Sequence, residues 1–262
     1  MVAAYSRFIA AMMIPSRVTG DLLAGMWHLL QGIGAVPRTL LWDNESGIGQ
    51  RGRLADGVAG FCGVLGTRLI QTRPYDPESK GLVERANGYL ETSFLPGRTF
   101  ASPADFNTQL WAWLAEIANR RVHANTGLVP ADALAADRAV MAALPPVAPA
   151  TGATVTTRLG RDYYVSCGGN AYSVDPEVIG RMITVTTGLD RITARCGDRL
   201  VADHERLWGT AGLLTDPEHL AAAAILREQF RTRPAAGAHL AVDVEVADLS
   251  AYDARFGTGE VA

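Results

Sequence analysis

The chain has 262 residues, of which 48% are hydrophobic and 19% charged, and its formal net charge is -3 at pH 7. These values are ordinary for a globular protein and leave room for one large domain or two modest ones. No run of about 18 uninterrupted apolar residues is present, so no membrane span is expected. The net charge excludes a bulk polycation, and a nucleic-acid partner would have to meet local basic patches.

The cysteines and the first residues set further limits. Cys62, Cys167 and Cys196 are far apart and form no CxxC pair, which disfavours both a disulfide framework and a cysteine zinc site. A short apolar stretch between Arg7 and Arg17 has no plausible cleavage site for a signal peptide. A cytoplasmic location is therefore expected.

The first predicted elements are extended chain and a helix. Residues 2–14 have the composition of strand material, with a break at residues 5–7. A helix capped by Ser16 or Thr19 is expected next, because apolar residues then recur at helical spacing until Gly34.

Two strands are expected after this helix. The apolar residues 39–42 stop at Asp43 and predict a buried strand in a sheet that is covered on both faces. The polar, glycine-rich residues 45–60 predict a loop. A short helix over residues 61–65 and a strand over residues 68–72 follow.

Prolines mark the next boundaries. Two prolines in residues 73–79 disfavour regular structure there, and a helix is expected to open near Lys80. Ser102 followed by Pro103 predicts a helix start, as a cap and a first helical residue. Because short strands and helices alternate, we expect an α/β layered domain over residues 1–135.

The pattern changes after a Pro/Ala-rich linker, residues 136–152. Short β-like runs separated by Gly, Asn and Asp predict a small β-barrel over residues 153–212. These runs are residues 154–157, 163–166, 171–174, 182–186, 192–195 and 200–204. Residues 213–262 are expected to hold one amphipathic helix, over residues 216–231, and a loose tail.

Two acidic residues stand where catalytic side chains gather in α/β proteins. Asp43 follows an apolar strand, and ligands collect at the carboxyl ends of strands in open sheets. An Asp-Asn pair at this point is also a common turn former. Glu84 lies near the start of the expected helix, where a glutamate favours the helix dipole without any further role.

Divalent metal chemistry is the requirement that would join the two acids. Attack on a phosphodiester needs an activated nucleophile and a stabilised leaving oxygen, and two divalent ions supply both. Mg²⁺ prefers carboxylate oxygens from several chain segments, so Asp43 and Glu84 are candidate ligands. Glu84 shares a polar helix face with Lys80, Asn87 and Glu91, and this face either lines a cleft or is simply solvated.

Several motifs together resemble one family. Residues 72–87, TRPYDPESKGLVERAN, are similar to the RPYxPxxKGxVER-N motif around the last acid of retroviral-type integrases. Residues 5–7 (YSR) and 41–44 (LWDN) are similar to the second strand of that class and to the strand that ends in its second Asp. Residues 94–98 (FLPGR) and 119–123 (NRRVH) resemble transposases of the IS21 (IstA) type. Tyr172-Ser173-Val174 and the later strands resemble a Mu-transposase-like C-terminal domain.

The resemblance implies an incomplete RNase H-like (integrase) core with a DDE metal triad. Asp43 matches the second acid and Glu84 the third, and both would hold Mg²⁺ or Mn²⁺. The first acid is expected on a strand ahead of Met1, which makes weak metal binding the expectation, and Asp21 lies in a helix where it does not replace that acid. DNA, further copies of the chain and an ATPase helper protein are the implied partners. The residues implied in DNA contact are Arg73, Tyr75, Lys80, Arg85, Asn87, Arg120 and Arg121.

Two other interpretations stay open. The chain is then either a catalytically dead transposase remnant that only binds DNA, or an RNase H-like nuclease that cuts without joining. Single residues also have simpler roles. The arginines would be ordinary surface cations, Tyr75 would pack between prolines, and His123 is interpreted as a cation at a helix C-terminus.

Overall fold

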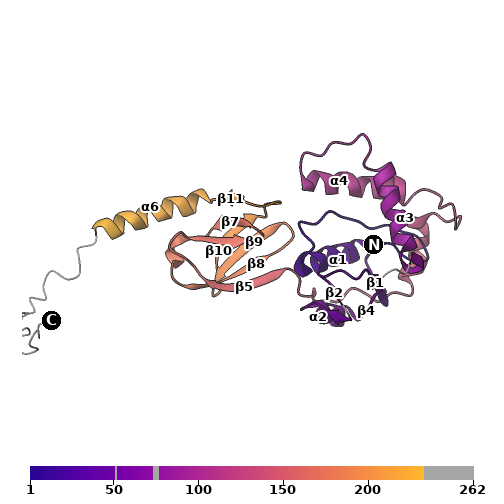
Figure 1. Ribbon diagram of the computed structural model, residues 1–262, viewed down its shortest axis with the longest axis horizontal. Helices are drawn as coiled ribbons and strands as arrows, with labels where there is room; N and C mark the ends of the chain where they lie inside the picture. Colours follow the sequence, from indigo (N-terminus) through magenta and orange to yellow (C-terminus); the bar gives the residue numbers. More distant parts are fainter. Residues whose placement is uncertain (51, 73–76, 233–262) are drawn as a thin grey trace, which may run out of the picture.

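The computed structural model describes residues 1–50, 52–72 and 77–232, and its architecture is mixed α/β. The elements up to residue 138 gather at one end of the molecule, and the strands of residues 153–214 lie beside them, followed by a long helix (Figure 1). No helix in the described ranges combines the length and apolar character needed to cross a bilayer.

The first residues do not form the strand predicted over residues 2–14. The chain turns back on itself, so that Val2 and Ile9 pair through an isolated antiparallel bridge. Arg7 takes a left-handed backbone conformation, with a φ of 63°, and its N–H donates to the Ala3 carbonyl at 3.1 Å. The local turn satisfies these backbone groups and replaces regular strand pairing.

Two buried asparagine side chains then hold the extended residues 8–14. Asn119 accepts from the Ile9 N–H and donates to the Ile9 carbonyl, both at 2.9 Å. Asn107 does the same with Met13, at 2.7 and 3.0 Å. Each amide supplies the acceptor and the donor that a neighbouring strand would offer.

Helix α1, Thr19–Ile33, buries its apolar face in the core, as its helical spacing predicts. The predicted cap at Ser16 or Thr19 is wrong, because the N-cap residue is Val18, whose side chain makes no capping bond. The Ser16 hydroxyl accepts from the Val18 N–H at 3.3 Å instead. Gly34 ends the helix in the left-handed conformation that favours glycine.

Strands β1, Thr39–Trp42, and β4, Arg68–Gln71, form a parallel pair, and helix α2, Val58–Leu65, lies in the crossover between them. The strand predicted to be covered on both faces is covered on one. Leu40 is buried in the core, whereas Leu41 on the opposite face is 59% exposed.

Residues 45–60, predicted as a loop, contain a small hairpin. Strands β2, Gly49–Gln50, and β3, Arg53–Leu54, pair antiparallel ahead of α2. A Cβ at Gly49 would lie 2.3 Å from the Arg53 carbonyl oxygen, so the hairpin requires glycine there. Strands of two residues carry no hydrophobic alternation, which is why the sequence pattern did not predict them.

Helix α3, Pro77–Ser93, begins earlier than the predicted start near Lys80, because proline fits a first helical turn where its missing N–H has no partner to lose. Helix α4, Pro103–Trp113, begins as predicted. The Ser102 hydroxyl caps it by accepting from the Asp105 N–H at 3.1 Å.

A π-helical turn and a short helix complete this part of the molecule. The turn η1, Leu114–Ala118, continues α4, and helix α5, Pro130–Arg138, follows after a loop. Tilted and edge-on ring pairs link α3 and α4 in one aromatic cluster. Its rings are Phe94, Phe100, Phe106 and Trp113.

The C-terminal strands form two sheets, ordered β10-β9-β8-β5 and β11-β7-β6. Their bounds are β5 Ala153–Arg158, β6 Tyr164–Cys167, β7 Asn170–Ser173, β8 Met182–Thr187, β9 Arg191–Cys196, β10 Arg199–Glu205 and β11 Leu213–Leu214. No strand ladder closes the two sheets into the predicted barrel within the described residues. Both contribute side chains, including Tyr172 and Ile183, to one apolar core, so packing rather than hydrogen bonding joins them.

Helix α6, Pro217–Thr232, follows the sheets and extends away from them (Figure 1). The Asp216 side chain accepts from the Glu218 N–H at 2.8 Å at its start, as expected for the predicted helix over residues 216–231. The predicted loose tail lies outside the described residues.

A buried ion pair connects α1 with the C-terminal sheets. Arg206 donates to both carboxylate oxygens of Asp21, at 2.5 and 2.9 Å, and to the Gly188 carbonyl at 2.7 Å. Both charged side chains are almost fully buried. The backbones of Gly20 and Gly152 also meet there, through an N–H to carbonyl bond of 3.3 Å.

Candidate metal site and basic surface

Asp43 lies at the carboxyl end of the parallel strand pair. It follows β1 directly, and β4 ends beside it because Trp42 and Gln71 are register partners. The Asn44 N–H donates to Asp43 Oδ1 at 2.7 Å, and the Thr72 hydroxyl donates to the same oxygen at 3.4 Å. Asp43 is exposed, so it is held in place while remaining accessible to a ligand.

Glu84 comes from α3, an element that is not part of the sheet. Ala86 on this helix and Phe94 directly after it are buried in the core, and Glu84 and Asn87 are exposed on another side of the helix. The polar helix face predicted from the sequence is therefore present at these two positions.

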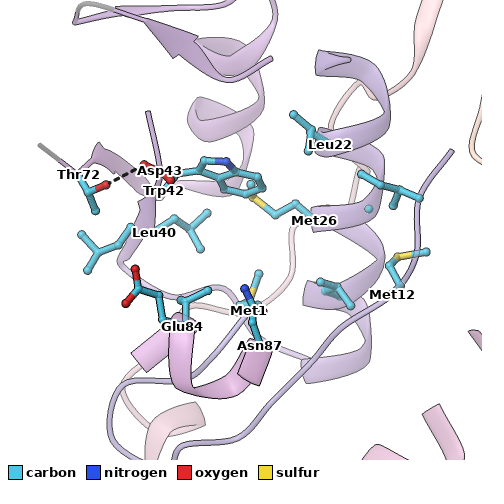
Figure 2. A pocket seen from close by; sticks show the side chains of 15 residues that line it. Met1, Met12, Leu22, Met26, Leu40, Trp42, Asp43, Thr72, Glu84 and Asn87 are labelled. Atoms are coloured by element: carbon cyan, nitrogen blue, oxygen red, sulfur yellow. Dashed lines mark hydrogen bonds between the residues drawn. The ribbon is translucent and has the colours of Figure 1, made fainter. Parts of the chain in front are cut away.

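One cavity brings these residues together. A cavity of about 410 Å³ lies between α1, β1 and α3, and Asp43, Glu84, Asn87 and Thr72 all line it. Figure 2 shows Asp43 and Glu84 along the same side of this cavity, opposite the side chains of α1. The rest of the lining is mainly apolar. It consists of Met1, Met12, Ile14, Leu22, Gly25, Met26, Leu29, Leu40, Leu41, Trp42 and Val83.

The site offers two carboxylates rather than a complete triad. Among the described residues, no group of three His, Cys, Asp or Glu side chains is arranged to hold a metal ion. Asp21 does not supply the missing acid, because it is buried and ion-paired with Arg206. The oxygen ligands that this part of the chain offers at the cavity are thus Asp43 and Glu84, with Asn87 beside them.

The residues predicted to contact DNA are distributed unevenly. Arg73 and Tyr75 lie outside the described residues, and Lys80 lies in the first turns of α3. Arg85 is exposed on α3, next to Glu84. Arg120 is exposed and lies 3.6 Å from Asp132 in a surface ion pair.

Arg121 and His123 have surroundings that the sequence did not predict. The Arg121 guanidinium carbon lies 3.4 Å from the centre of the Tyr89 ring, so this arginine is stacked rather than free on the surface. The interpretation of His123 as a helix C-terminal cation is wrong, because η1 ends at Ala118 and the chain has left the helix before His123.

Thr72 and the two backbone-binding asparagines also have roles that were not predicted. Thr72 follows β4 at the same edge as Asp43, so the parallel pairing of two strands that both end in polar residues is a pattern that can reveal such a contact. Asn107 and Asn119 act on a segment about a hundred positions away, which no local pattern reveals.

Residues 144–216 match the family described as the Mu transposase C-terminal domain. The transposase for insertion sequence element IS21 of Pseudomonas aeruginosa is 31% identical over 149 residues, which cover 56% of this chain and 38% of that protein. The transposase for an IS21-like element of Bacteroides fragilis is 28% identical over 113 residues, 41% of this chain and 22% of that protein. The chain thus spans well under half the length of these relatives.

A solved structure is also similar in part. It is a chain from the cryoEM structure of the simian T-cell lymphotropic virus intasome in complex with PP2A regulatory subunit B56 gamma. The alignment covers 80% of this chain and 69% of that one, with 19% identity and a TM-score of 0.42. A TM-score at this level is too low to define a shared fold.

Proposed function

The chain is similar to transposases of IS21-type elements, and on this basis we propose that Asp43 and Glu84 are metal-binding residues of an enzyme that cuts and joins DNA strands. One observation carries the proposal: two exposed carboxylates from different elements line the same cavity. A hard divalent cation takes its oxygen ligands from separate chain segments in this way.

The donor set fits Mg²⁺ or Mn²⁺. Magnesium is commonly held by one or two carboxylates, with waters and substrate phosphates filling the other positions. Because the described residues offer two carboxylates, we expect weak binding until a further ligand joins. A bound ion would activate a water or hydroxyl nucleophile and stabilise the leaving oxygen.

The neighbouring residues position these groups. The two hydrogen bonds to Asp43 Oδ1, from Asn44 and Thr72, limit rotation of the carboxylate. The apolar lining of the cavity excludes water from one side of the site and so strengthens the electrostatic interactions made there. Asn87 lines the same cavity, and its amide would donate to a phosphate oxygen of DNA.

The same premise extends to the fold and the partners. An RNase H-like core over residues 1–135 is supported by the parallel β1–β4 pair, with an acid at the end of β1 and a second acid on the helix after β4. DNA is the proposed substrate, and further copies of the chain and an ATPase helper protein are the proposed partners. Lys80, Arg85 and Arg120 would contact DNA phosphates.

Metal binding tests the proposal on this chain alone. Titration of Mn²⁺, followed by electron paramagnetic resonance, should show weak binding that falls at least tenfold in Asp43→Asn and in Glu84→Gln. Glu91→Gln is the matched control, because Glu91 is exposed on α3 but does not line the cavity. Equal binding by all four proteins would exclude the site.

A strand-transfer assay on oligonucleotide element ends then tests the reaction. Joined product that requires Mg²⁺ and disappears in Asp43→Ala and Glu84→Ala supports the enzyme. Cut ends without joined product would indicate the nuclease instead. Salt-sensitive DNA binding with no product at all would indicate a DNA-binding remnant.

A further inference from the structure

Three arginines and one histidine from distant parts of the sequence lie close to α3. Arg7 lies in the first turn of the chain, Arg85 on α3, and Arg121 and His123 after η1. The hydrogen bonds between Ile9 and Asn119 bring the segment of Arg7 beside that of Arg121, and the Arg121 guanidinium lies over Tyr89 of α3. We refer to Arg7, Arg85, Arg121 and His123 as the cationic cluster.

The cationic cluster lacks partners for several of its nitrogen atoms. Arg7 Nε, Arg121 Nη1 and His123 Nδ1 are buried and have no hydrogen-bond partner within the described part of the chain. Buried polar groups in folded proteins are almost always paired, so three such atoms in one place call for a physical explanation. The Asp137 carboxylate binds the chain one residue before Arg7, where it accepts from the Ser6 N–H at 3.0 Å.

The other arginines in hydrogen-bonded ion pairs provide a contrast. Arg17, Arg191, Arg199, Arg206 and Arg231 each donate to a carboxylate at 2.5 to 2.6 Å. Within the described residues no such pair involves a member of the cationic cluster. The like charges of the three arginines repel one another, and this repulsion is reduced when an anion binds among them.

Two features hold the cations in this arrangement. The Arg121 guanidinium is stacked on the Tyr89 ring, which fixes its plane. Arg7 keeps a left-handed φ of 63°, a conformation that is unfavourable for a residue other than glycine. Burial, followed by the charges of Arg121, Arg7 and Arg85, lowers the pKa of His123 below its ordinary value. An anion bound in the cluster would offset those charges and raise the pKa of His123.

We propose that Arg7, Arg121 and His123 form a binding site for a phosphate group, which takes a backbone phosphate when DNA is bound. Guanidinium groups bind phosphate oxygens through two parallel N–H bonds, and an imidazole supplies a further donor. Arg7, Arg121 and His123 are half-buried and Arg85 is exposed, so the phosphate approaches from the surface past Arg85. This inference rests on the proposed action on DNA. The inference adds Arg7 and His123 to the residues expected to bind DNA.

The phosphate site lies next to the two carboxylates along α3, so it can position a DNA strand there. Glu84 and Arg85 are consecutive on α3, and Glu84 lines the cavity while Arg85 belongs to the cationic cluster. A DNA strand that places one phosphate in the cluster would therefore run along α3 next to the carboxylates. The cluster would position the strand and take no part in the chemical step.

DNA binding without metal tests the site independently of catalysis. Fluorescence anisotropy with a short labelled duplex, in EDTA, should show a five- to tenfold loss of affinity in each of Arg7→Gln, Arg121→Gln and His123→Gln. In each arginine variant, the slope of log K against log salt concentration should also fall in magnitude by about one, as expected for the loss of one phosphate contact. Arg53→Gln is the matched control, because it removes an exposed arginine of β3 and should change affinity less than twofold.

A second measurement separates DNA phosphate from a free anion and covers variants that fold poorly. In the unaltered protein, NMR titration should show the His123 pKa rising on addition of the duplex at micromolar concentration, and rising with inorganic phosphate only at millimolar concentration. The proposal is overturned if the three variants bind DNA like Arg53→Gln, if the His123 pKa does not respond to DNA, or if phosphate matches the duplex. If the DNA results hold while strand transfer fails, the phosphate site stands and the proposed enzyme does not.

Discussion

At the scale of single residues, Asn119 holds the start of the chain in place. It is more deeply buried than Asn107, and both of its amide atoms bond to the Ile9 backbone. Replacing it with alanine leaves a buried N–H and a buried carbonyl without partners, each at a cost of about 1–3 kcal/mol. We expect Asn119→Ala to lower the free energy of unfolding by about 2–4 kcal/mol in urea titrations.

A surface asparagine provides the control for this prediction. Asn125 is exposed in a turn, and Asn125→Ala should change the unfolding free energy by no more than about 0.5 kcal/mol. If the two variants unfold at the same urea concentration, the paired amide of Asn119 contributes nothing to stability.

At the scale of elements, the start of α4 shows how local chemistry specifies a helix. The Ser102 hydroxyl accepts from the Asp105 N–H, and the Asp105 carboxylate accepts from the Ala101 N–H at 2.9 Å, so two terminal N–H groups are satisfied. We expect Ser102→Ala to lower the unfolding free energy by about 1 kcal/mol. Ser46→Ala, at an exposed position outside helices and strands, should leave the urea midpoint unchanged.

The elements that the sequence predicted are those with local patterns of this kind. Ser102-Pro103 marks a helix start, and the apolar run before Asp43 marks a strand. Both signals act within a few residues. The β2–β3 hairpin and the exposed face of β1 depend on what packs around them, so the predictions of a loop and of a fully covered strand were wrong.

The candidate site also contains residues that the sequence predicts and residues that it does not. The sequence predicts Asp43 as a candidate because it ends a strand, and Glu84 because it lies on the next long helix. Both line one cavity in the structure. The cationic cluster was not predicted as a unit. Arg7 and His123 are separated by more than a hundred positions, and the hydrogen bonds between Ile9 and Asn119 join the segments that carry them.

At the scale of the whole molecule, one buried ion pair joins the helical part to the C-terminal sheets. Asp21 belongs to α1, while Arg206 follows β10. Removal of one charge leaves the other uncompensated in the interior, at a cost of about 3–5 kcal/mol. The linker between α5 and β5 crosses the same junction, since Gly152 bonds to Gly20.

We therefore expect Arg206→Met to unfold at a much lower urea concentration than the unaltered protein, and to be cut by elastase, which cleaves after small apolar residues, near residues 144–150 as the junction loosens. Asp21→Leu combined with Arg206→Met should recover much of the loss, because an apolar pair leaves no charge without a partner. Arg191→Met is the matched control, since it breaks an exposed pair with Asp203 that solvent screens. If Arg206→Met behaves like Arg191→Met, the two parts are held together by other contacts, and the ion pair does not fix their orientation.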